Sequence, residues 1–129
     1  MSLKSRLREQ DRRDRSNFGT HKTGTSNRRR WTNDRFWKAV EAGRMDFHGE
    51  NLSGLSFNRA ILARVDFSGA NLSGTNFIGA NLSSANFSHA DLHGTVFFKA
   101  HLHDADFTGA RGVKNNRYLS TKQRNQAKS

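Results

Sequence analysis

The chain of 129 residues contains no cysteine and no proline. Without cysteine it has no disulfide framework and no thiolate that could bind a metal or act as a nucleophile. Without proline it keeps every backbone N–H that a continuous ladder of strands requires. The start lacks the apolar core of a signal peptide, and no apolar run approaches the length of a membrane span, about eighteen residues. We therefore expect a protein of the cytoplasm, or of a particle assembled there.

Acidic residues are scarce and unevenly placed, which leaves a formal net charge of +11. Residues 1–44 carry thirteen Lys/Arg against five Asp/Glu, residues 45–112 carry four against six, and residues 113–129 carry five against none. Two basic segments therefore flank a nearly neutral middle. Such segments are typical of proteins that bind nucleic acid or another polyanion, although they can also serve only to keep a protein in solution.

Large apolar residues recur at every fifth position, with Phe and Leu strictly alternating. A period of five matches neither the 3.6-residue period of an α-helix nor the two-residue period of a strand. A short period maintained over this length is typical of a solenoid, in which each repeat packs on its neighbours. The thirteen residues are Phe47, Leu52, Phe57, Leu62, Phe67, Leu72, Phe77, Leu82, Phe87, Leu92, Phe97, Leu102 and Phe107.

Each of these residues has neighbours of the same kinds. A small residue usually stands two positions before it, Asn or Asp usually stands one position before it, and Ser, Gly, Thr or His usually follow, as in Ala-Asn-Leu-Ser-Gly at 70–74. This pattern resembles the pentapeptide-repeat family, whose consensus is A-(D/N)-(L/F)-x-x. The resemblance covers residues 45–112 and implies an all-β solenoid, a right-handed quadrilateral β-helix of about three coils with four pentapeptides in each coil. Residues one coil apart would then stack, and opposed Phe columns would fill the interior.

The segments beside the repeats are expected to cover its ends. Residues 33–43 have the pattern of a helix whose start Asn33 or Thr32 can cap. Its apolar face, which includes Phe36 and Trp37, fits a cap over the first coil, and the alternative is an aromatic platform for nucleic-acid bases. Candidates to cover the last coil are Val113, Tyr118 and Leu119. The expected organisation is a basic extended arm at 1–31, disordered unless bound, a capping helix at 32–44, the β-helix at 45–112 and a basic tail at 113–129.

Four apolar residues occupy repeat positions where the pattern usually has a polar side chain pointing outward. Ile78 and Phe98 both follow a central Phe and are one expected coil apart, so they should stack on one side of the solenoid. An outward apolar cluster on a polar surface marks a contact site for a protein partner, although a folded-back arm of the same chain could also cover it. The predicted docking residues are Ile61, Ile78, Val96 and Phe98.

Basic residues of both flanking segments are the candidates for polyanion binding. Three consecutive arginines precede Trp31, and the C-terminal segment has no acidic residue between its cations. Cations neutralise phosphates and an aromatic ring can stack on a base, but nothing in the pattern reads a base edge, so nucleic-acid binding is expected to be non-specific. The predicted residues are Arg12, Arg13, Arg15, Arg28, Arg29, Arg30, Trp31, Lys114, Arg117, Lys122, Arg124 and Lys128.

Catalytic and metal-binding patterns are scarce. The sequence has no Gly-rich phosphate loop, nucleophile elbow or HExxH motif. His101 and His103 flank Leu102 and could bind Zn²⁺ only weakly, because a closed site needs about four ligands. We expect no enzyme activity, no metal, no cofactor and no small-molecule substrate.

The sequence therefore favours a structural or adaptor protein. The β-helix would dock to protein partners, and the basic arms would anchor it in a large anionic assembly such as a ribosome-like or virion-like particle. The alternative follows from the family resemblance, because some pentapeptide-repeat proteins bind type II topoisomerases by mimicking DNA and confer quinolone resistance. Mimicry needs a strongly negative surface, whereas residues 45–112 carry a net charge of only −2.

Overall fold

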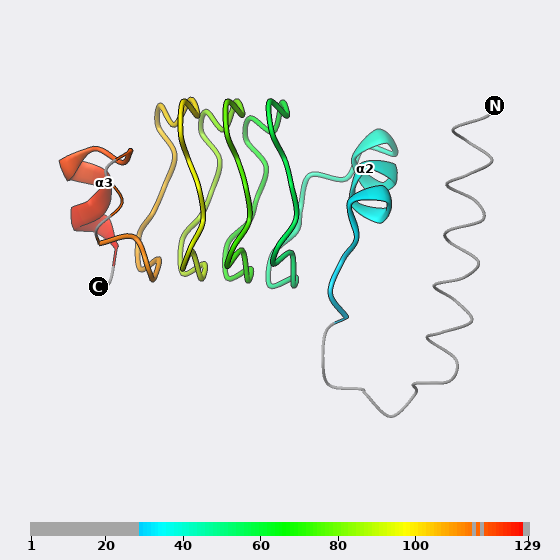
Figure 1. The fold of residues 1–129 in the computed structure, drawn as a ribbon, viewed down its shortest axis with the longest axis horizontal. Helices are drawn as coiled ribbons and strands as arrows, with labels where there is room; N and C mark the ends of the chain where they lie inside the picture. Colours follow the sequence, from blue (N-terminus) through cyan, green and yellow to red (C-terminus); the bar gives the residue numbers. More distant parts are fainter. Residues whose placement is uncertain (1–28, 115, 117, 128–129) are drawn as a thin grey trace.

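The structure is a computed structural model that describes residues 29–114, 116 and 118–127 (Figure 1). The expected arm at 1–31 lies outside the described residues except for its last three. A stack of coils forms the centre, between helix α2 (Asn33–Glu41) and helix α3 (Thr121–Gln126). Parallel bridges join residues twenty positions apart, from Asp46 with Asp66 to Asp91 with Arg111. Four pentapeptides therefore complete one coil, as the family resemblance implied.

Hydrogen bonds between coils explain the fixed register. The Leu72 N–H donates to the Asp91 carbonyl at 2.9 Å, and the Asp91 N–H donates back to the Ala70 carbonyl at 2.9 Å. The same exchange recurs along successive sides of the coils. Because every side contributes main-chain donors and acceptors, the absence of proline has a direct structural reason.

The corner between two sides is encoded by the residues on both sides of each Phe or Leu. At residues 71–75, the Asn71 side-chain oxygen accepts from the Ser73 N–H at 3.0 Å and from the Ser73 hydroxyl at 2.7 Å. The next residue, Gly74, has a φ of +70°, a left-handed conformation that glycine adopts without steric cost. The Thr75 N–H then donates to the Leu72 carbonyl at 3.0 Å and closes the turn. Each pentapeptide thus carries both a short straight side and its corner.

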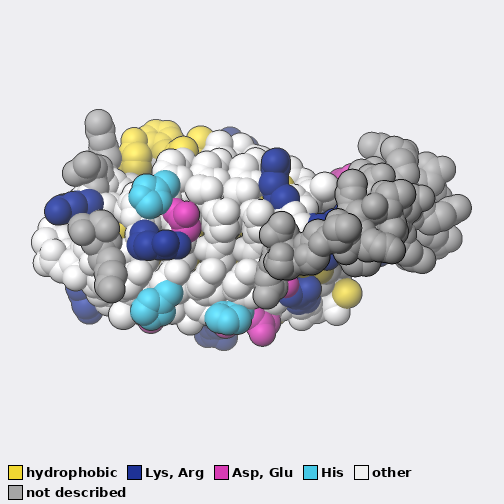
Figure 2. Space-filling model, turned by 90° about the horizontal axis from the view of Figure 1, so that it is seen from below, with side chains coloured by type: hydrophobic (Ala, Val, Ile, Leu, Met, Phe, Trp, Pro, Cys, Tyr) yellow, Lys and Arg dark blue, Asp and Glu magenta, His cyan; other side chains and the backbone are white. Residues whose placement is uncertain are grey.

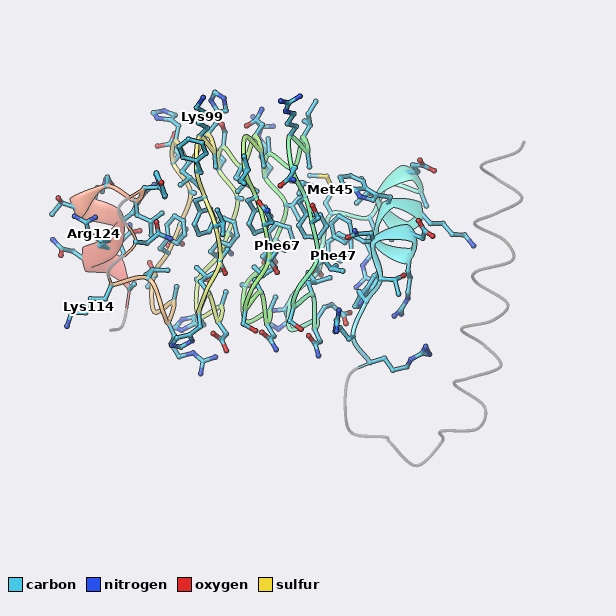
Figure 3. The ribbon with its side chains drawn as sticks, viewed as in Figure 1. Met45, Phe47, Phe67, Lys99, Lys114 and Arg124 are labelled. Atoms are coloured by element: carbon cyan, nitrogen blue, oxygen red, sulfur yellow. The ribbon has the colours of Figure 1, made fainter. Side chains whose placement is uncertain are left out.

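Buried Phe and Leu side chains fill the interior. Phe87 stacks between Phe67 and Phe107, with ring centroids 5.5 and 5.1 Å away. It also makes edge contacts with Phe77 and Phe97 of the opposite column, at 5.8 and 5.7 Å. Figure 3 shows the rings pointing inward from the coils. Aromatic rings prefer such offset and edge-to-face arrangements. The contacts confirm that side chains fill the centre of the stack.

Helix α2 lies at the N-terminal end of the stack (Figure 1). It begins after Thr32, whose hydroxyl accepts from the Arg35 N–H at 3.1 Å. Its Phe36 is fully buried, with its ring 4.5 Å from Phe47 and 4.4 Å from Phe57. The apolar face of this helix is therefore used against the first coil, and Phe36 is not open to a nucleic-acid base.

The C-terminal segment folds over the other end of the stack. Val113 and Leu119 are buried there, as expected for residues that cover the last coil, whereas Tyr118 is 44% exposed. Helix α3 then begins after Ser120, which forms a capping box with Gln123. The sequence predicted only a basic tail here, and that prediction missed this helix. It is six residues long and has no buried residue, so it left no apolar period to recognise.

Candidate docking and polyanion-binding surfaces

The structure brings three of the four predicted docking residues together. Ile78 and Phe98 occupy the same position in successive coils, because the Gly79 N–H donates to the Phe98 carbonyl at 2.9 Å. Val96 lies on the same side as Phe98, in the chain position that bridges to Asn76. Val96 and Phe98 are 37% and 41% exposed, and Ile78 is half-buried. Apolar surface is therefore concentrated on one side near the C-terminal end.

Tyr118 extends this surface, although it is not among the predicted docking residues. Its ring packs against Phe98 with centroids 5.4 Å apart and an angle of 69°. The spacing signal was available, because Tyr118 follows Phe98 by the length of one coil. It was missed because the repeats end at about residue 112. We call Ile78, Phe98 and Tyr118 the apolar column; the Lys99 ammonium lies 5.3 Å from the Phe98 ring centroid beside it.

Ile61 is not part of the apolar column. It is 77% exposed and bridges to Asn81, on the side of the coil that carries Leu62. Val96 and Phe98 lie on the neighbouring side and two coils farther along the stack. The structure therefore separates Ile61 from the other predicted docking residues.

The basic residues before α2 have mixed surroundings. Trp31 is only 3% exposed, its indole N–H donates to Glu50 Oε1 at 3.2 Å, and its ring packs 5.4 Å from Phe47. The Arg35 guanidinium covers the same ring at 3.9 Å. Stacking of Trp31 on a base is therefore incompatible with this arrangement, because the ring already packs on the first coil. Arg30 is exposed and remains a candidate for phosphate contact.

The C-terminal cations also differ in their exposure and in their contacts. Lys114 and Lys122 are exposed. Arg124 is half-buried and donates to the Asn116 and Leu119 carbonyls, both at 3.1 Å, so it helps to hold the C-terminal segment in place. Figure 2 shows Lys, Arg and His side chains scattered over one face of the stack, together with a few acidic side chains. The predicted residues that lie outside the described residues are Arg12, Arg13, Arg15, Arg28, Arg117 and Lys128.

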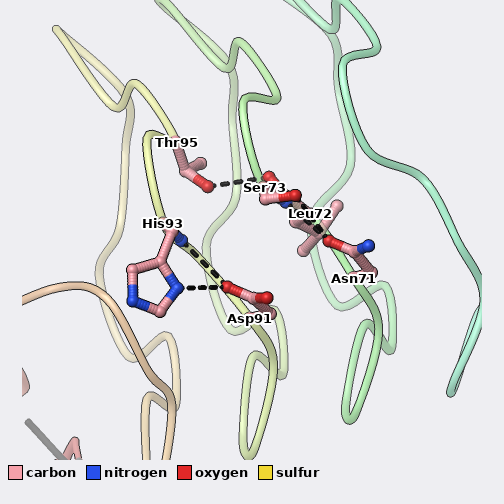
Figure 4. A network of polar contacts seen from close by, with 6 residues as sticks. All are labelled: Asn71, Leu72, Ser73, Asp91, His93 and Thr95. Atoms are coloured by element: carbon pink, nitrogen blue, oxygen red, sulfur yellow. Dashed lines mark hydrogen bonds and ion pairs between the residues drawn. The ribbon is translucent and has the colours of Figure 1, made fainter.

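Carboxylates on the coils are held by the corner motif. Burial raises the pKa of Asp91, but hydrogen bonds from the His93 side chain and backbone outweigh this and leave it below its ordinary value. The His93 ring nitrogen lies 2.6 Å from the Asp91 oxygen (Figure 4). Hydrogen bonds from the Thr108 side chain and backbone lower the pKa of Asp106. These groups serve the turns, as Asn71 does with Ser73 in Figure 4.

The histidines do not form a metal site within the described part of the chain. His101 and His103 are exposed, and His103 lies 3.3 Å from the Asp104 carboxylate. No group of three or more His, Cys, Asp or Glu residues that could hold a metal ion occurs among the described residues. None of the helices in the described ranges has the length and hydropathy needed to cross a membrane.

An open groove lies between the last coil and α3, with a volume of about 730 Å³. Its floor includes Ala100, Leu102 and Ala105, and its wall includes Tyr118 and Lys122. Tyr118 therefore belongs to both the groove and the apolar column. No sequence pattern indicates this groove, because it depends on how Tyr118, Leu119 and α3 lie over the last coil.

The repeated sequence matches a known family. The description of the matching family is "Pentapeptide repeats (8 copies)", and the matches at residues 46–79 and 75–111 together cover just over half of the chain. The chain is a pentapeptide-repeat protein. Proteins of this family form right-handed quadrilateral β-helices, in agreement with the twenty-residue register of the coils. No curated protein sequence matches the chain.

Solved structures of pentapeptide-repeat proteins resemble the chain. HetL, involved in heterocyst differentiation regulation in the cyanobacterium Nostoc sp. strain PCC 7120, is 36% identical over 54% of this chain and 34% of HetL, with a TM-score of 0.50. A protein from the Arabidopsis thaliana thylakoid lumen is 32% identical over 50% of this chain and 55% of its own, with a TM-score of 0.35. This pentapeptide-repeat protein thus spans less than two thirds of either relative.

QnrB1, a plasmid-mediated fluoroquinolone resistance protein, is a more distant relative. It is 20% identical over 50% of this chain and 37% of QnrB1, with a TM-score of 0.20. A likeness of this size carries no inference about the function of this pentapeptide-repeat protein.

Proposed function

We propose that this pentapeptide-repeat protein is a non-enzymatic adaptor that docks to a protein partner through the apolar column and Val96. The exposed Phe98 and Tyr118 rings carry the proposal, because they form an aromatic pair on the surface of the stack. Aromatic residues are enriched at the centres of protein interfaces. The filled interior supports a binding role, since the coils leave no central pocket for a substrate.

The basic segments supply the second part of the proposed function, which is anchoring to a polyanion. Residues 1–44 and 113–129 carry net charges of +8 and +5 around a middle of −2. Arg30, Lys114 and Lys122 are exposed at opposite ends of the stack and can contact phosphates without disturbing the coils. Such contacts would be non-specific and would hold the protein in a nucleic-acid-containing particle in the cytoplasm. In this proposal α2 acts as the cap of the solenoid, and Ile61 contributes a separate apolar contact.

Nucleic-acid binding by the full chain tests the anchoring part. We expect labelled single- and double-stranded oligonucleotides to bind with an affinity that falls steeply as salt is raised, because each neutralised phosphate releases counterions. Replacing Arg12, Arg13, Arg15, Arg28, Arg29 and Arg30 by Gln should flatten the slope, whereas Arg59→Gln and Arg64→Gln on the coils should not. Absence of binding at low salt would eliminate the anchoring part.

The apolar column requires a separate test, which is cross-linking in the native assembly. A photoreactive side chain at Phe98 should capture one defined protein, and the same group at Ser83, on a different side of the coils, should not. Equal products from both positions would contradict docking through the column. Topoisomerase binding remains the alternative from the family, but the charge of −2 on residues 45–112 gives it no support as a DNA mimic.

A further inference from the structure

Two cations border the apolar column along one corner of the stack. The Arg59 N–H donates to the Ile78 carbonyl at 2.7 Å, and the Gly79 N–H donates to the Phe98 carbonyl at 2.9 Å. Arg59, Gly79 and Lys99 therefore follow one another at this corner in successive coils. Arg59 and Lys99 are exposed, and the Lys99 ammonium lies 5.3 Å from the Phe98 ring centroid. Figure 3 shows Lys99 at this edge of the stack.

Gly79 keeps the space between these two cations open. A Cβ on Gly79 would lie 3.4 Å from the Arg59 Cγ and would otherwise meet nothing within 4 Å outside its chain neighbours. The Arg59 side chain thus extends over Gly79, toward the coil that carries Lys99. Because coils are roughly 4.8 Å apart, both long side chains can reach an anionic group placed above Gly79.

The side of the stack that carries the apolar column has positive charge and no negative charge. In the coils, this side consists of residues 56–59, 76–79 and 96–99, which contain Arg59 and Lys99 but no Asp or Glu. Neither cation forms an ion pair with a residue that the structure describes. Because potentials across protein interfaces are complementary, unpaired cations beside an apolar surface favour a partner of opposite charge.

The carboxylates that lie next to this side leave the two cations unpaired. Asp104 occupies the far corner of the following side. At the N-terminal end, the Ser56 N–H donates to Asn33 Oδ1 of α2 at 3.3 Å. The adjacent Asp34 forms no ion pair with Arg59 in the described part of the chain. The positive charge beside the apolar column therefore has no counterpart on the neighbouring elements.

The spacing along the apolar column matches an α-helix better than a strand. Successive coils are roughly 4.8 Å apart, and the Phe98 and Tyr118 ring centroids are 5.4 Å apart. A helix advances about 5.4 Å per turn, whereas side chains on one face of a strand are about 6.6 Å apart. Arg59 and Lys99, which are two coils apart, match residues two helical turns apart. A helix lying along the stack can therefore place one apolar row on the column and one acidic row beside the cations.

Charge and side-chain shape argue against other occupants of this surface. Residues 1–28 contain eight Lys/Arg against three Asp/Glu, and a second copy would bring a net charge of +11. Like charges across an interface are unfavourable, so a separate acidic protein complements the surface better than this chain does. A nucleic acid is also anionic, but Ile78 and Val96 offer no ring on which a base could stack.

We propose that an acidic amphipathic helix of a partner protein docks along the apolar column. Its apolar row packs on Ile78, Phe98 and Tyr118, and carboxylates of the neighbouring row pair with Arg59 and Lys99. Amphipathic helices that bind an apolar surface in this way use anchors spaced i, i+3, i+4 and i+7. The proposal rests on the docking function above and defines the chemistry of the partner.

Binding of a designed helical peptide to the isotope-labelled full chain tests this proposal. The probe is acetyl-Ala-Leu-Glu-Ala-Gln-Leu-Glu-Ala-Leu-Glu-Ala-Gln-Leu-Glu-Ala-Ala-amide, in which Leu forms one helical row and Glu forms the row beside it. We expect saturable NMR shifts of the Ile78, Phe98 and Tyr118 side chains. Thr108, on the opposite side of the coils, should not shift. Gln in place of every Glu should weaken the affinity at least threefold, and absence of saturable shifts at the column would overturn the proposal.

Charge-reversal variants locate the acidic contacts. Arg59→Glu and Lys99→Glu should each weaken binding of the peptide at least threefold. Arg64→Glu is the matched control, because Arg64 is exposed at the next corner and has a φ of +66°, close to the +60° of Arg59. Its affinity should not change. Unchanged affinity in either of the first two variants would contradict the acidic partner.

A reordered peptide distinguishes a docked helix from a strand and from non-specific attraction. It contains the same residues with Leu at every second position, and it should bind at least threefold more weakly. Equal binding would overturn the helix. Loss of oligonucleotide affinity in Phe98→Ala would assign the column to nucleic acid. Nuclear Overhauser effects between Phe98 and residues 1–28, or shifts of the free chain on dilution, would show that the arm or a second copy covers it, and each of these results would also overturn the proposal.

The Phe98 cross-link separates this proposal from the docking function itself. A defined cross-linked product that is lost when Arg59→Glu and Lys99→Glu are combined would support both. A product that persists in the combined variant would leave the docking function intact and reject the acidic helix. Absence of any defined product in the unmodified background would reject the docking function.

Discussion

At the scale of single residues, the corner positions impose the strictest requirement. Gly112 has a φ of +82°, and a Cβ on it would lie 2.6 Å from the His93 backbone nitrogen and 2.8 Å from its Cα. Gly49 has a φ of +70°, but a Cβ there would meet nothing within 4 Å. The two glycines therefore separate the cost of backbone conformation from the cost of steric contact.

Alanine substitutions at these glycines should destabilise the protein by different amounts. We expect Gly49→Ala to lower the free energy of unfolding by about 1 kcal/mol, the usual cost of a left-handed residue with a side chain. Gly112→Ala should cost about 2–3 kcal/mol, because backbone atoms of His93 must also move. Urea unfolding of both variants measures the difference, and equal costs would show that the contact at Gly112 is relieved freely.

A second prediction at this scale concerns acid stability. The pKa of Asp106 is lowered by the Thr108 hydrogen bonds, so its stabilising contribution is present above the unfolded pKa of about 3.9 and is lost as pH falls through the lower folded value. Asp106→Asn keeps an acceptor for the turn, as Asn86 does for the Ser88 N–H. Its urea midpoint should therefore fall less between pH 5 and pH 2 than that of the wild type. If the urea midpoints of the variant and the wild type fell equally with pH, Asp106 would have no such role.

At the scale of the elements, α2 depends on a single buried side chain. Phe36 packs on the Phe47 and Phe57 rings at the first coil, and it is the only fully buried residue of this helix. The Thr32 cap adds local support, but a nine-residue helix has marginal stability without tertiary contacts. Attachment to the stack therefore decides whether α2 forms.

Phe36→Ala should detach α2 from the first coil. The expected loss is about 3–5 kcal/mol, as for other buried Phe residues, together with faster amide exchange in Asn33–Glu41. Glu41→Ala is the control, because Glu41 is exposed at the end of the same helix and its replacement should change stability by less than about 0.5 kcal/mol. Unchanged exchange in the Phe36 variant would mean that other contacts hold α2.

At the scale of the whole molecule, the register of twenty residues makes the stack modular. Each coil contacts only the coils beside it, apart from the two ends. Stability of such an array is approximately a sum of contributions from coils and their interfaces. A whole coil can therefore be removed without changing which residue types stack.

Deletion of residues 65–84 should give a shorter folded protein, because Phe87 then stacks directly on Phe47. Deletion of residues 70–84 removes less of the chain, but it moves every later pentapeptide to the neighbouring side of the coil. Phe87 then lies over Leu52, and α3 lies over the wrong side of the last coil. We expect dispersed NMR spectra and cooperative unfolding for the first variant and loss of both for the second. A cooperatively folded second variant would contradict control of the fold by this register.

Much of the solenoid could be predicted because its information is local and repeated. Each pentapeptide carries an inward Phe or Leu, usually an Asn or Asp that binds the corner, and often a Gly at the left-handed position. The outward position of Phe98 follows from the same period. The prediction for Trp31 went wrong because an arginine-aromatic cluster has the same composition whether its ring faces solvent or, as here, packs on Phe47.

The sequence alone establishes the five-residue period and the basic flanks, since these follow from residue type and spacing, and the family resemblance implies the filled interior. The folded chain shows in addition that Trp31 is buried, that Tyr118 extends the apolar column, and that Gln123 of α3 reaches the Leu102 carbonyl. These contacts join the coils to segments outside the repeats. Their geometry depends on how the chain folds back over the two ends of the stack, and no periodic pattern in the sequence encodes that path.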